Sequence, residues 1–156
     1  SVYQITMWRL KLKENYYAPR YALSMLTPAL LHDMNISNCY INHKTVERWW
    51  IIKHDINLAD AKFHGYWFSG AGRSDSGKVY VSWYEWEKPS PYSRLLIVGN
   101  TGRKEQLAAL KINWKKLGLA PEKARLHDLW QNREISSLDS LRVKGNNFLL
   151  IGITAK

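Results

Sequence analysis

Cysteine is nearly absent from this chain of 156 residues, which contains Cys39 and no other. A single thiol can form neither an intrachain disulfide nor a thiolate metal cluster. Apolar runs of the roughly 20 residues that cross a bilayer are also missing. The first residues lack a charged segment followed by an apolar stretch, so we expect no signal peptide in this sequence. Because the chain begins at Ser1 without an initiator Met, we expect it to be the end of a longer protein.

Phenylalanine is scarce as well, with three residues against eight Trp and nine Tyr. Trp and Tyr rings have an apolar face and a polar edge, which suits interfaces and sugar-binding surfaces. The same rings suit the core of a sheet whose margins are partly wet. The aromatic bias alone therefore leaves a binding role and a structural role open.

Acidic residues are the minority among the charges, since 13 Asp and Glu stand against 23 Lys and Arg and give a net charge of +10. The basic residues are scattered, and the densest groups are only Arg103-Lys104 and Lys115-Lys116. A nucleic-acid-binding domain usually concentrates basic charge on one face and has a recognisable motif. The chain has no zinc-finger spacing and no RNP-type strand. We interpret the charge as a solvated basic surface and expect no nucleic-acid partner, with a nucleic-acid-binding domain as a less favoured alternative.

Hydrophobic patterning divides the chain near residue 45. Residues 2–12 alternate and predict a strand, and Asn15–Asn35 has the spacing of a helix that Pro28 should kink or shorten. Downstream, short blocks rich in β-branched and aromatic residues, bounded by Gly, Asn or Pro, predict antiparallel strands. The predicted strands are Trp49–Ile52, Phe63–Phe68, Lys78–Glu87, Leu95–Val98, Leu107–Trp114, Lys123–Trp130, Ile135–Val143 and Phe148–Ile153. The pattern favours a mainly β fold, an antiparallel β-sandwich of about seven to nine strands with a short N-terminal helical segment.

Two of these strands have patterns that place them in the sheet. Phe148–Ile153 is apolar at consecutive positions, so we expect both of its faces to be covered. Lys78–Glu87 alternates, with Val79, Val81 and Trp83 on one face and Tyr80, Ser82, Tyr84 and Trp86 on the other. The helix near residues 19–34, a separate barrel domain or a sugar could cover the aromatic face. Between the strands, the glycine-rich segment Ser69–Gly77 is expected to be an irregular loop.

Several blocks occur in the order of a known family. They are Lys78–Ser82, Leu95–Gly102, Lys111–Trp114 with Lys116–Leu119, Arg125–Trp130 ending in Asp-Leu-Trp, and Val143–Ile153. In this order they resemble the C-terminal β-sandwich that follows the catalytic barrel in bacterial glycoside hydrolases, both α-galactosidase-like and β-N-acetylgalactosaminidase-like enzymes. The resemblance covers roughly residues 63–153. Upstream, Tyr21–Pro28 and Leu31–Met34 are similar to a final barrel helix and loop.

The resemblance implies a non-catalytic accessory domain that packs on the catalytic barrel of its parent chain, and a contribution to carbohydrate binding is the further expectation. It divides the chain into residues 1–45, a strand and helix segment left from the barrel, and residues 46–156, the sandwich. The catalytic carboxylates of such enzymes belong to the barrel, so no catalytic residue is assigned here. A bacterial, secreted protein in the periplasm or outside the cell is implied. A stand-alone carbohydrate-binding module is the alternative.

The chain was also searched for chemistry of its own. Glycosidic cleavage needs two carboxyl groups, and the closest pair is Glu85 and Glu87, which we interpret as solvated acids at a strand edge. His127-Asp128 could orient an imidazole, but no Ser or Cys nucleophile motif accompanies it. The five histidines form no ligand set, so we expect no metal and no cofactor.

Exposed aromatic rings are the remaining candidates for a local function, because a pyranose lays its C–H face on an aromatic face. We predict carbohydrate binding at Trp49, Trp50, Tyr84 and Trp86. The competing interpretation is that these rings form the core of the sandwich or its contact with the barrel, since most Trp residues in small domains are largely buried.

Overall fold

The computed structural model describes residues 18–37, 41–88 and 90–155. The strand predicted at residues 2–12 and Cys39 lie outside the described residues. The elements of the described chain are α2 (Pro19–Leu31), α3 (His43–Asp55), η2 (Leu58–Asp60), β1 (Ala61–His64), α4 (Tyr66–Ser69), β2 (Gly72–Ser74), β3 (Val79–Trp86), β4 (Arg94–Asn100), β5 (Gln106–Ala108), β6 (Leu110–Ile112), α5 (Trp114–Leu117), η3 (Pro121–Lys123), β7 (Ala124–Asp128), β8 (Arg133–Ile135), β9 (Leu141–Val143) and β10 (Asn147–Ala155).

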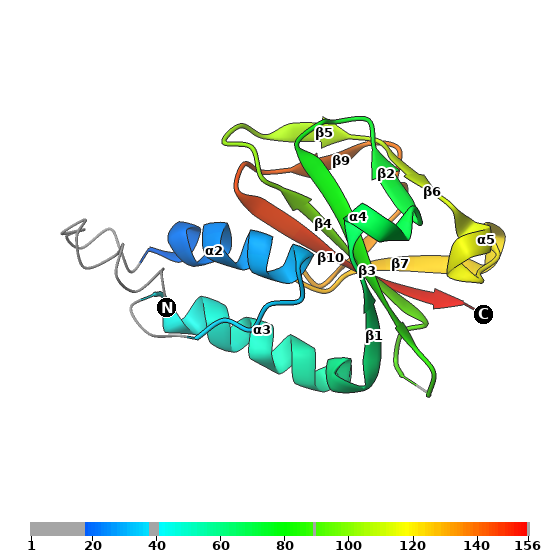
Figure 1. The fold of residues 1–156 in the computed structure, drawn as a ribbon, viewed down its shortest axis with the longest axis horizontal. Coiled ribbons are helices and arrows are strands. Elements are labelled where there is room, and N and C mark those ends of the chain that lie inside the picture. The colour runs from blue at the N-terminus through cyan, green and yellow to red at the C-terminus, as the bar shows by residue number, and fades with distance from the viewer. Residues whose placement is uncertain (1–17, 38–40, 89, 156) are drawn as a thin grey trace.

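Six strands form one large antiparallel sheet in the order β1-β3-β4-β10-β7-β8. Strand β10 lies inside this sheet, with Leu150 opposite Ile97 of β4 and Gly152 opposite His127 of β7. This confirms the central place predicted from its consecutive apolar residues. Two small antiparallel sheets, β2-β6 and β5-β9, complete the β structure of the described residues (Figure 1).

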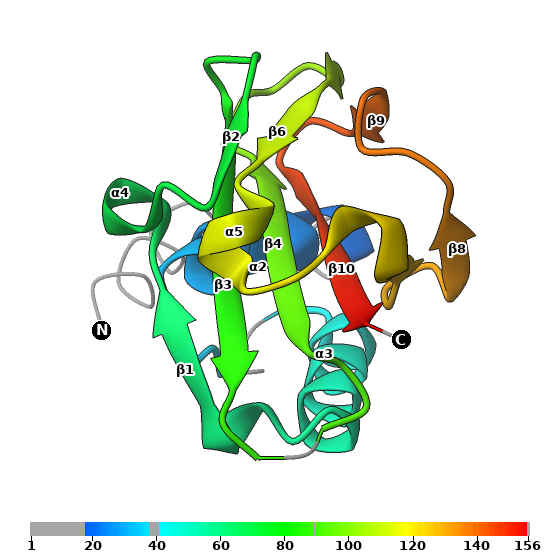
Figure 2. The same ribbon diagram turned by 90° about the vertical axis from the view of Figure 1, so that its right-hand side faces the viewer.

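The large sheet separates two clusters of buried residues. The first is mostly aliphatic and lies between the sheet, the small sheets and α5; its members include Val79, Val81, Trp83, Leu110, Leu117 and Val143. The second joins α2 and α3 to the opposite face and includes Leu26, Leu30, Trp49, Tyr84, Trp86 and Trp130. Figure 2 shows α5 in front of the sheet and α2 behind it. The fold is mainly β, an antiparallel sandwich with N-terminal helices, and the two faces predicted for β3 are confirmed.

Helix α2 covers the aromatic face of β3. The Ser82 hydroxyl donates to the carbonyl of Leu31 at 2.8 Å, and the Tyr84 hydroxyl donates to a carboxylate oxygen of Asp33 at 2.6 Å. A Cβ on Gly99 of β4 would lie 2.6 Å from the side chain of Leu31, so this strand needs glycine where the helix approaches. The sequence left open whether a helix, a barrel domain or a sugar covers the aromatic face of β3, and in the structure helix α2 covers it.

The helix begins with Pro19 in its first turn, where a missing backbone N–H costs little. Pro28 lies inside it, and the helix ends one turn later at Leu31, well before the predicted end at Asn35. Thr27 is buried and donates its hydroxyl to the carbonyl of Leu23 at 2.8 Å.

The strand predicted at Trp49–Ile52 is wrong, because these residues belong to α3. The Asn42 side chain caps this helix by accepting from the backbone N–H of Thr45 at 2.9 Å. Val46 and Trp49 are buried one turn apart, which is helical spacing; the β-branched and aromatic run concealed it. The boundary predicted between residues 45 and 46 consequently falls inside α3, and the division into two domains stays a prediction.

Three other predicted segments are subdivided. Phe63–Phe68 is not one strand, because β1 ends at His64 and Gly65 precedes the short helix α4. Leu107–Trp114 contains most of β5, all of β6 and the first residue of α5, and Ile135–Val143 contains the last residue of β8 and all of β9. The loop expected at Ser69–Gly77 includes β2, which pairs with β6. In each case a short strand pairs with a partner distant in sequence, which local propensity cannot show.

Candidate functional site

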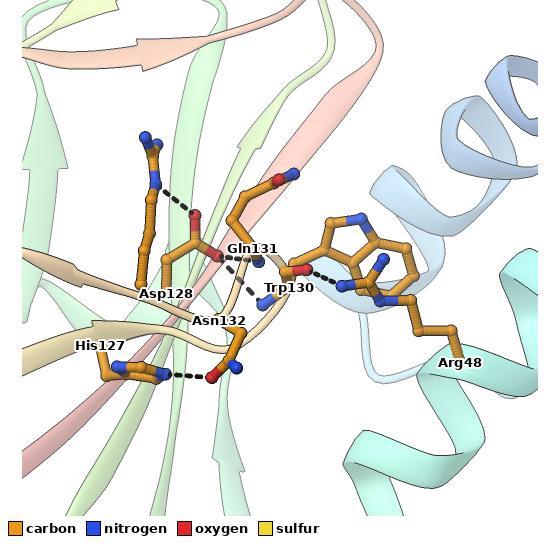
Figure 3. Close-up of polar contacts among 7 residues, drawn as sticks. Arg48, His127, Asp128, Trp130, Gln131 and Asn132 are labelled. Carbon is orange, nitrogen blue, oxygen red and sulfur yellow. Dashed lines mark hydrogen bonds and ion pairs between the residues drawn. The ribbon is translucent and has the colours of Figure 1, made fainter.

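The turn between β7 and β8 contains a buried carboxylate. The Asp128 side chain is fully buried, and its Oδ1 accepts from the backbone N–H groups of Trp130 at 3.0 Å and Gln131 at 3.1 Å. The Nε of Arg133 lies 3.6 Å from Oδ2 of the same carboxylate. Figure 3 shows the Asp128 carboxylate directed at the backbone of its own turn. Through Oδ1 this carboxylate holds the turn closed, whereas Oδ2 has no hydrogen-bond partner among the described residues and is buried away from any substrate.

Helix α3 is fastened to this turn through Arg48. Its guanidinium donates to the carbonyl oxygen of Trp130 and lies over the indole, 4.9 Å from the ring centroid (Figure 3). The buried Trp130 also meets Phe148 of β10 edge to face, with 5.0 Å between centroids. The orientation of the His127 imidazole by Asp128, which the sequence left open, is not seen: Nε2 of His127 lies 3.1 Å from Oδ1 of Asn132 instead. We interpret this constellation as structural.

A second constellation lies at the other end of the large sheet, where β1, β3 and β4 run side by side. His64 Nε2 and Glu85 Oε1 are hydrogen-bonded at 2.8 Å. The imidazole stacks on Trp83, its cross-strand neighbour, with 4.0 Å between ring centroids and 10° between the planes. Arg94 of β4 is opposite Glu85 in register and places Nη2 3.7 Å from Glu85 Oε2. Three strands thereby bring an imidazole, a carboxylate and a guanidinium into one row.

Two buried donors in this constellation have no hydrogen-bond partner in the described structure. They are the indole Nε1 of Trp83 and the Nε of Arg94. The Arg94 side chain also donates from Nη1 to the carbonyl of Ser93 at 2.6 Å, so its guanidinium is only partly satisfied. Unpaired buried donors cost free energy, and in native proteins they call for an explanation.

A pocket of about 330 Å³ opens beside this row, and we call it the His64–Glu85 pocket. Its walls are Phe63, His64, Gly65, Phe68, Trp83, Glu85 and Lys116. The His64 and Glu85 side chains are about one quarter exposed, whereas Phe68 of α4 is almost fully exposed. Lys116 comes from α5. The pocket combines a carboxylate, an ammonium group and aromatic surface, a combination that suits a small polar ligand with an apolar face.

The four rings predicted to bind carbohydrate lie elsewhere. Trp49 of α3 is buried together with Tyr84 and Trp86 of β3, between the helices and the large sheet. The indole N–H of Trp86 donates to the carbonyl of Asn57 at 2.9 Å. Burial, the hydrogen bond to Asp33 and the Asp33 charge raise the pKa of Tyr84 far above its ordinary value. Trp50 is 42% exposed on the outer side of α3. The structure therefore does not gather the four on one surface, and carbohydrate binding by them stays a prediction.

The interpretation of Glu85 and Glu87 as solvated acids agrees with the structure for Glu87 and is wrong for Glu85, which is about one quarter exposed and paired with His64 and Arg94. Glu85 faces the pocket, whereas Glu87 follows the end of β3 and is exposed. Sequence reasoning missed His64, Phe68 and Lys116. The alternation of β3 already placed Glu85 on the same side as Trp83 and could have indicated a polar position next to an aromatic one. No local pattern could bring Lys116 to them.

Within residues 18–37, 41–88 and 90–155, no group of three or more His, Cys, Asp or Glu side chains is placed to hold a metal ion. The helices of the same residues are all too short or too polar to cross a membrane.

No curated protein matches the chain. The family model for glycoside hydrolase 123, C-terminal domain, matches residues 45–154 and so takes in most of α3, all six strands of the large sheet and both small sheets. The chain therefore belongs to the family of glycoside hydrolase 123 C-terminal domains.

Proposed function

We propose that this chain is a non-catalytic accessory domain that packs on the catalytic domain of a family 123 glycoside hydrolase. The family match over residues 45–154 carries the proposal, because the matched family is defined as the C-terminal part of such an enzyme. The surroundings of the acids agree with it. Glu85 is paired with His64 and Arg94, Asp128 is closed by its own turn, and neither has a second carboxylate beside it among the described contacts.

The contact with the catalytic domain is assigned to α4, through the α4 surface formed by Trp67 and Phe68. Phe68 is 87% exposed and Trp67 is 47% exposed, although large apolar side chains are usually withdrawn from water. Trp67 is held in place by stacking on His32, with 5.2 Å between ring centroids and 20° between planes. Rigid exposed aromatic rings are typical anchors of protein interfaces. The proposed occupant is the catalytic barrel of the parent enzyme.

The test compares two apolar surfaces in the full-length enzyme. The variant Trp67→Ser/Phe68→Ser removes the α4 surface, and Leu107→Ser removes another largely exposed apolar side chain, from β5. We expect the first variant to lower the thermal midpoint of activity by several degrees and to speed proteolysis between the domains. The second variant should behave like the wild type. Unchanged stability in both variants would argue against docking through α4.

Two further measurements examine the remaining parts of the proposal. The 156-residue chain alone should not hydrolyse aryl glycosides, and hydrolysis abolished by Glu85→Gln would show that the domain is catalytic after all. Fractionation of cells that produce the full enzyme examines the proposed periplasmic or extracellular location. Activity confined to the cytoplasm would contradict it.

A further inference from the structure

We propose that the His64–Glu85 pocket binds one pyranose residue of a carbohydrate. The inference rests on the proposed function in one respect, namely that the pocket belongs to an accessory domain of a sugar-cleaving enzyme. Phe68 forms part of both the pocket and the α4 surface, so the bound sugar would lie next to the catalytic domain. Ligand sites occur preferentially at such domain boundaries.

The apolar part of the pocket matches one face of a sugar ring. Phe63 and Phe68 are walls of the pocket, and the ring of Phe68 is open to solvent. A pyranose has C–H groups on its face, which pack on an aromatic ring and bury apolar surface from both partners. The volume of about 330 Å³ lies at the lower end of the range of small-ligand sites. A single sugar residue is the size of ligand that this volume favours.

The polar part of the pocket matches hydroxyl groups. Glu85 Oε1 accepts from His64, but its Oε2 is 3.7 Å from Arg94, which is too long for a hydrogen bond. Oε2 can therefore accept a hydrogen bond from a hydroxyl. Lys116 offers an ammonium group that can donate to a neighbouring hydroxyl oxygen. Because each hydroxyl both donates and accepts, a pair of them can bridge Glu85 and Lys116.

Trp83 provides an independent indication. It lines the pocket, and its indole N–H is buried without an acceptor. Its ring position is fixed by the stacked imidazole of His64. The nitrogen has almost no accessible surface in the described structure, so a sugar oxygen would supply the missing acceptor only after the pocket side chains shift to admit it. A purely anionic ligand fits less well, since it would lie against the Glu85 carboxylate.

The experiment is a titration of the 156-residue chain, labelled with ¹⁵N at its Trp indoles. The probes are methyl galactopyranoside, methyl glucopyranoside and methyl N-acetylgalactosaminide, with glycerol and acetate as non-sugar controls. The Trp83 resonance is assigned from Trp83→Phe. We expect at least one sugar to shift this resonance saturably while the resonance of the exposed Trp50 stays unchanged. If no sugar shifts it, or if glycerol or acetate produces the same shift, the inference is wrong.

Paired variants locate the site. Glu85→Gln and Lys116→Met should each weaken sugar binding about tenfold, as expected for the loss of a charged hydrogen-bonding group. Glu87→Gln and Lys115→Met, exposed neighbours outside the pocket, should bind like the wild type. Equal losses in both pairs would overturn the assignment. Lys116 is exposed, so its variant keeps the test valid if Glu85→Gln folds poorly.

The test is separable from that of the proposed function. Sugar binding is measured on the chain alone and needs no catalytic domain, whereas docking is measured in the full enzyme through Trp67 and Phe68. If a sugar binds to the chain alone but Trp67→Ser/Phe68→Ser leaves the full enzyme unchanged, only the proposed function is refuted. Intact docking with no sugar binding would refute only this inference.

Discussion

Two carboxylates at opposite ends of the large sheet have almost the same neighbours and different roles. Asp128 and Glu85 each lie near a Trp and have an Arg nitrogen at 3.6–3.7 Å. Asp128 is 0% exposed and accepts from two backbone N–H groups of its own turn, whereas the Glu85 side chain is 27% exposed and is held by side chains of neighbouring strands. Residue type does not distinguish a structural acid from an available one. The two acids are distinguished by their partners, which are backbone N–H groups of its own turn for Asp128 and side chains of neighbouring strands for Glu85.

The largest effect is expected at Asp128. Asp128→Ala leaves two backbone N–H groups of the turn without their acceptor, and one of these, on Trp130, is buried. Hydrogen bonds to a charged acceptor are worth more than neutral ones, so the free energy of unfolding should fall by about 3 kcal/mol. Urea denaturation followed by circular dichroism measures it.

The matched control for Asp128 is Arg133→Ala. The Arg133 side chain is 64% exposed, so losing this ion pair should change the free energy of unfolding by less than about 0.5 kcal/mol. If the two variants are equally destabilised, the Asp128 carboxylate acts through the ion pair and not through the backbone of its turn.

A third carboxylate, Asp33, lies between these extremes because it accepts from the buried Tyr84 across the junction of α2 and β3. Tyr84→Phe should lower the free energy of unfolding at neutral pH by about 1.5 kcal/mol. Tyr80→Phe, which loses only a long contact of 3.4 Å to the carbonyl of Gly77, should cost much less.

Tyr84 also predicts a pH dependence. Burial, followed by the hydrogen bond and charge of Asp33, raises its pKa above the ordinary value of 10.0, so the folded state binds the phenol proton more tightly than the unfolded state. The stability from this group is complete below pH 10 and is lost as the pH rises above 10. In Tyr84→Phe the decline above pH 10 should be shallower, with a remainder from Tyr92, whose pKa burial also raises. An unchanged slope would contradict the assignment.

An effect of similar size is expected where α3 meets the Asp128 turn. Arg48→Met removes both the hydrogen bond to the Trp130 carbonyl and the stacking over its indole, and should cost about 1–2 kcal/mol. Arg48→Lys keeps the charge but not the planar group, so it should recover less than half of the loss. Lys44→Met, an exposed change on the same helix, is the control, and all three are measured by urea denaturation.

The smallest effect on stability is expected at Glu85. Glu85→Gln keeps an oxygen that accepts from His64, and the site is partly solvated, so the free energy of unfolding should change by less than about 1 kcal/mol. The same variant should bind sugar about tenfold more weakly. A loss of stability comparable to that of Asp128→Ala would remove the distinction between the two carboxylates.

The sequence predicted those features that depend on a short repeat along one strand. Alternation placed Val81 and Tyr84 on opposite faces of β3, and consecutive apolar residues placed β10 inside the sheet. The run Trp49–Ile52 was misassigned because β-branched and aromatic residues favour strands locally, while the cap at Asn42 and burial through tertiary packing make it a helix. Which element covers Tyr84 could not be derived, because the answer lies in α2, far upstream.

The candidate site was less accessible to sequence reasoning than the fold. Glu85 was noticed, but as the partner of Glu87, its neighbour in the chain. Its actual partners come from β1 and β4, and Lys116 joins them from α5. A site assembled from separate elements by sheet pairing leaves no spacing pattern in the chain.

The inner position of β10 has a consequence for biosynthesis. A ribosome releases β1, β3 and β4 first and the β7-β8 hairpin later, but only β10 joins these two groups. Until Asn147–Ala155 emerges, Leu95–Val98 of β4 is paired with β3 on one side only, and its other side is open to pairing with other chains. A nascent chain that stalls before residue 147 should therefore be a substrate for chaperones and proteases rather than a partly working domain.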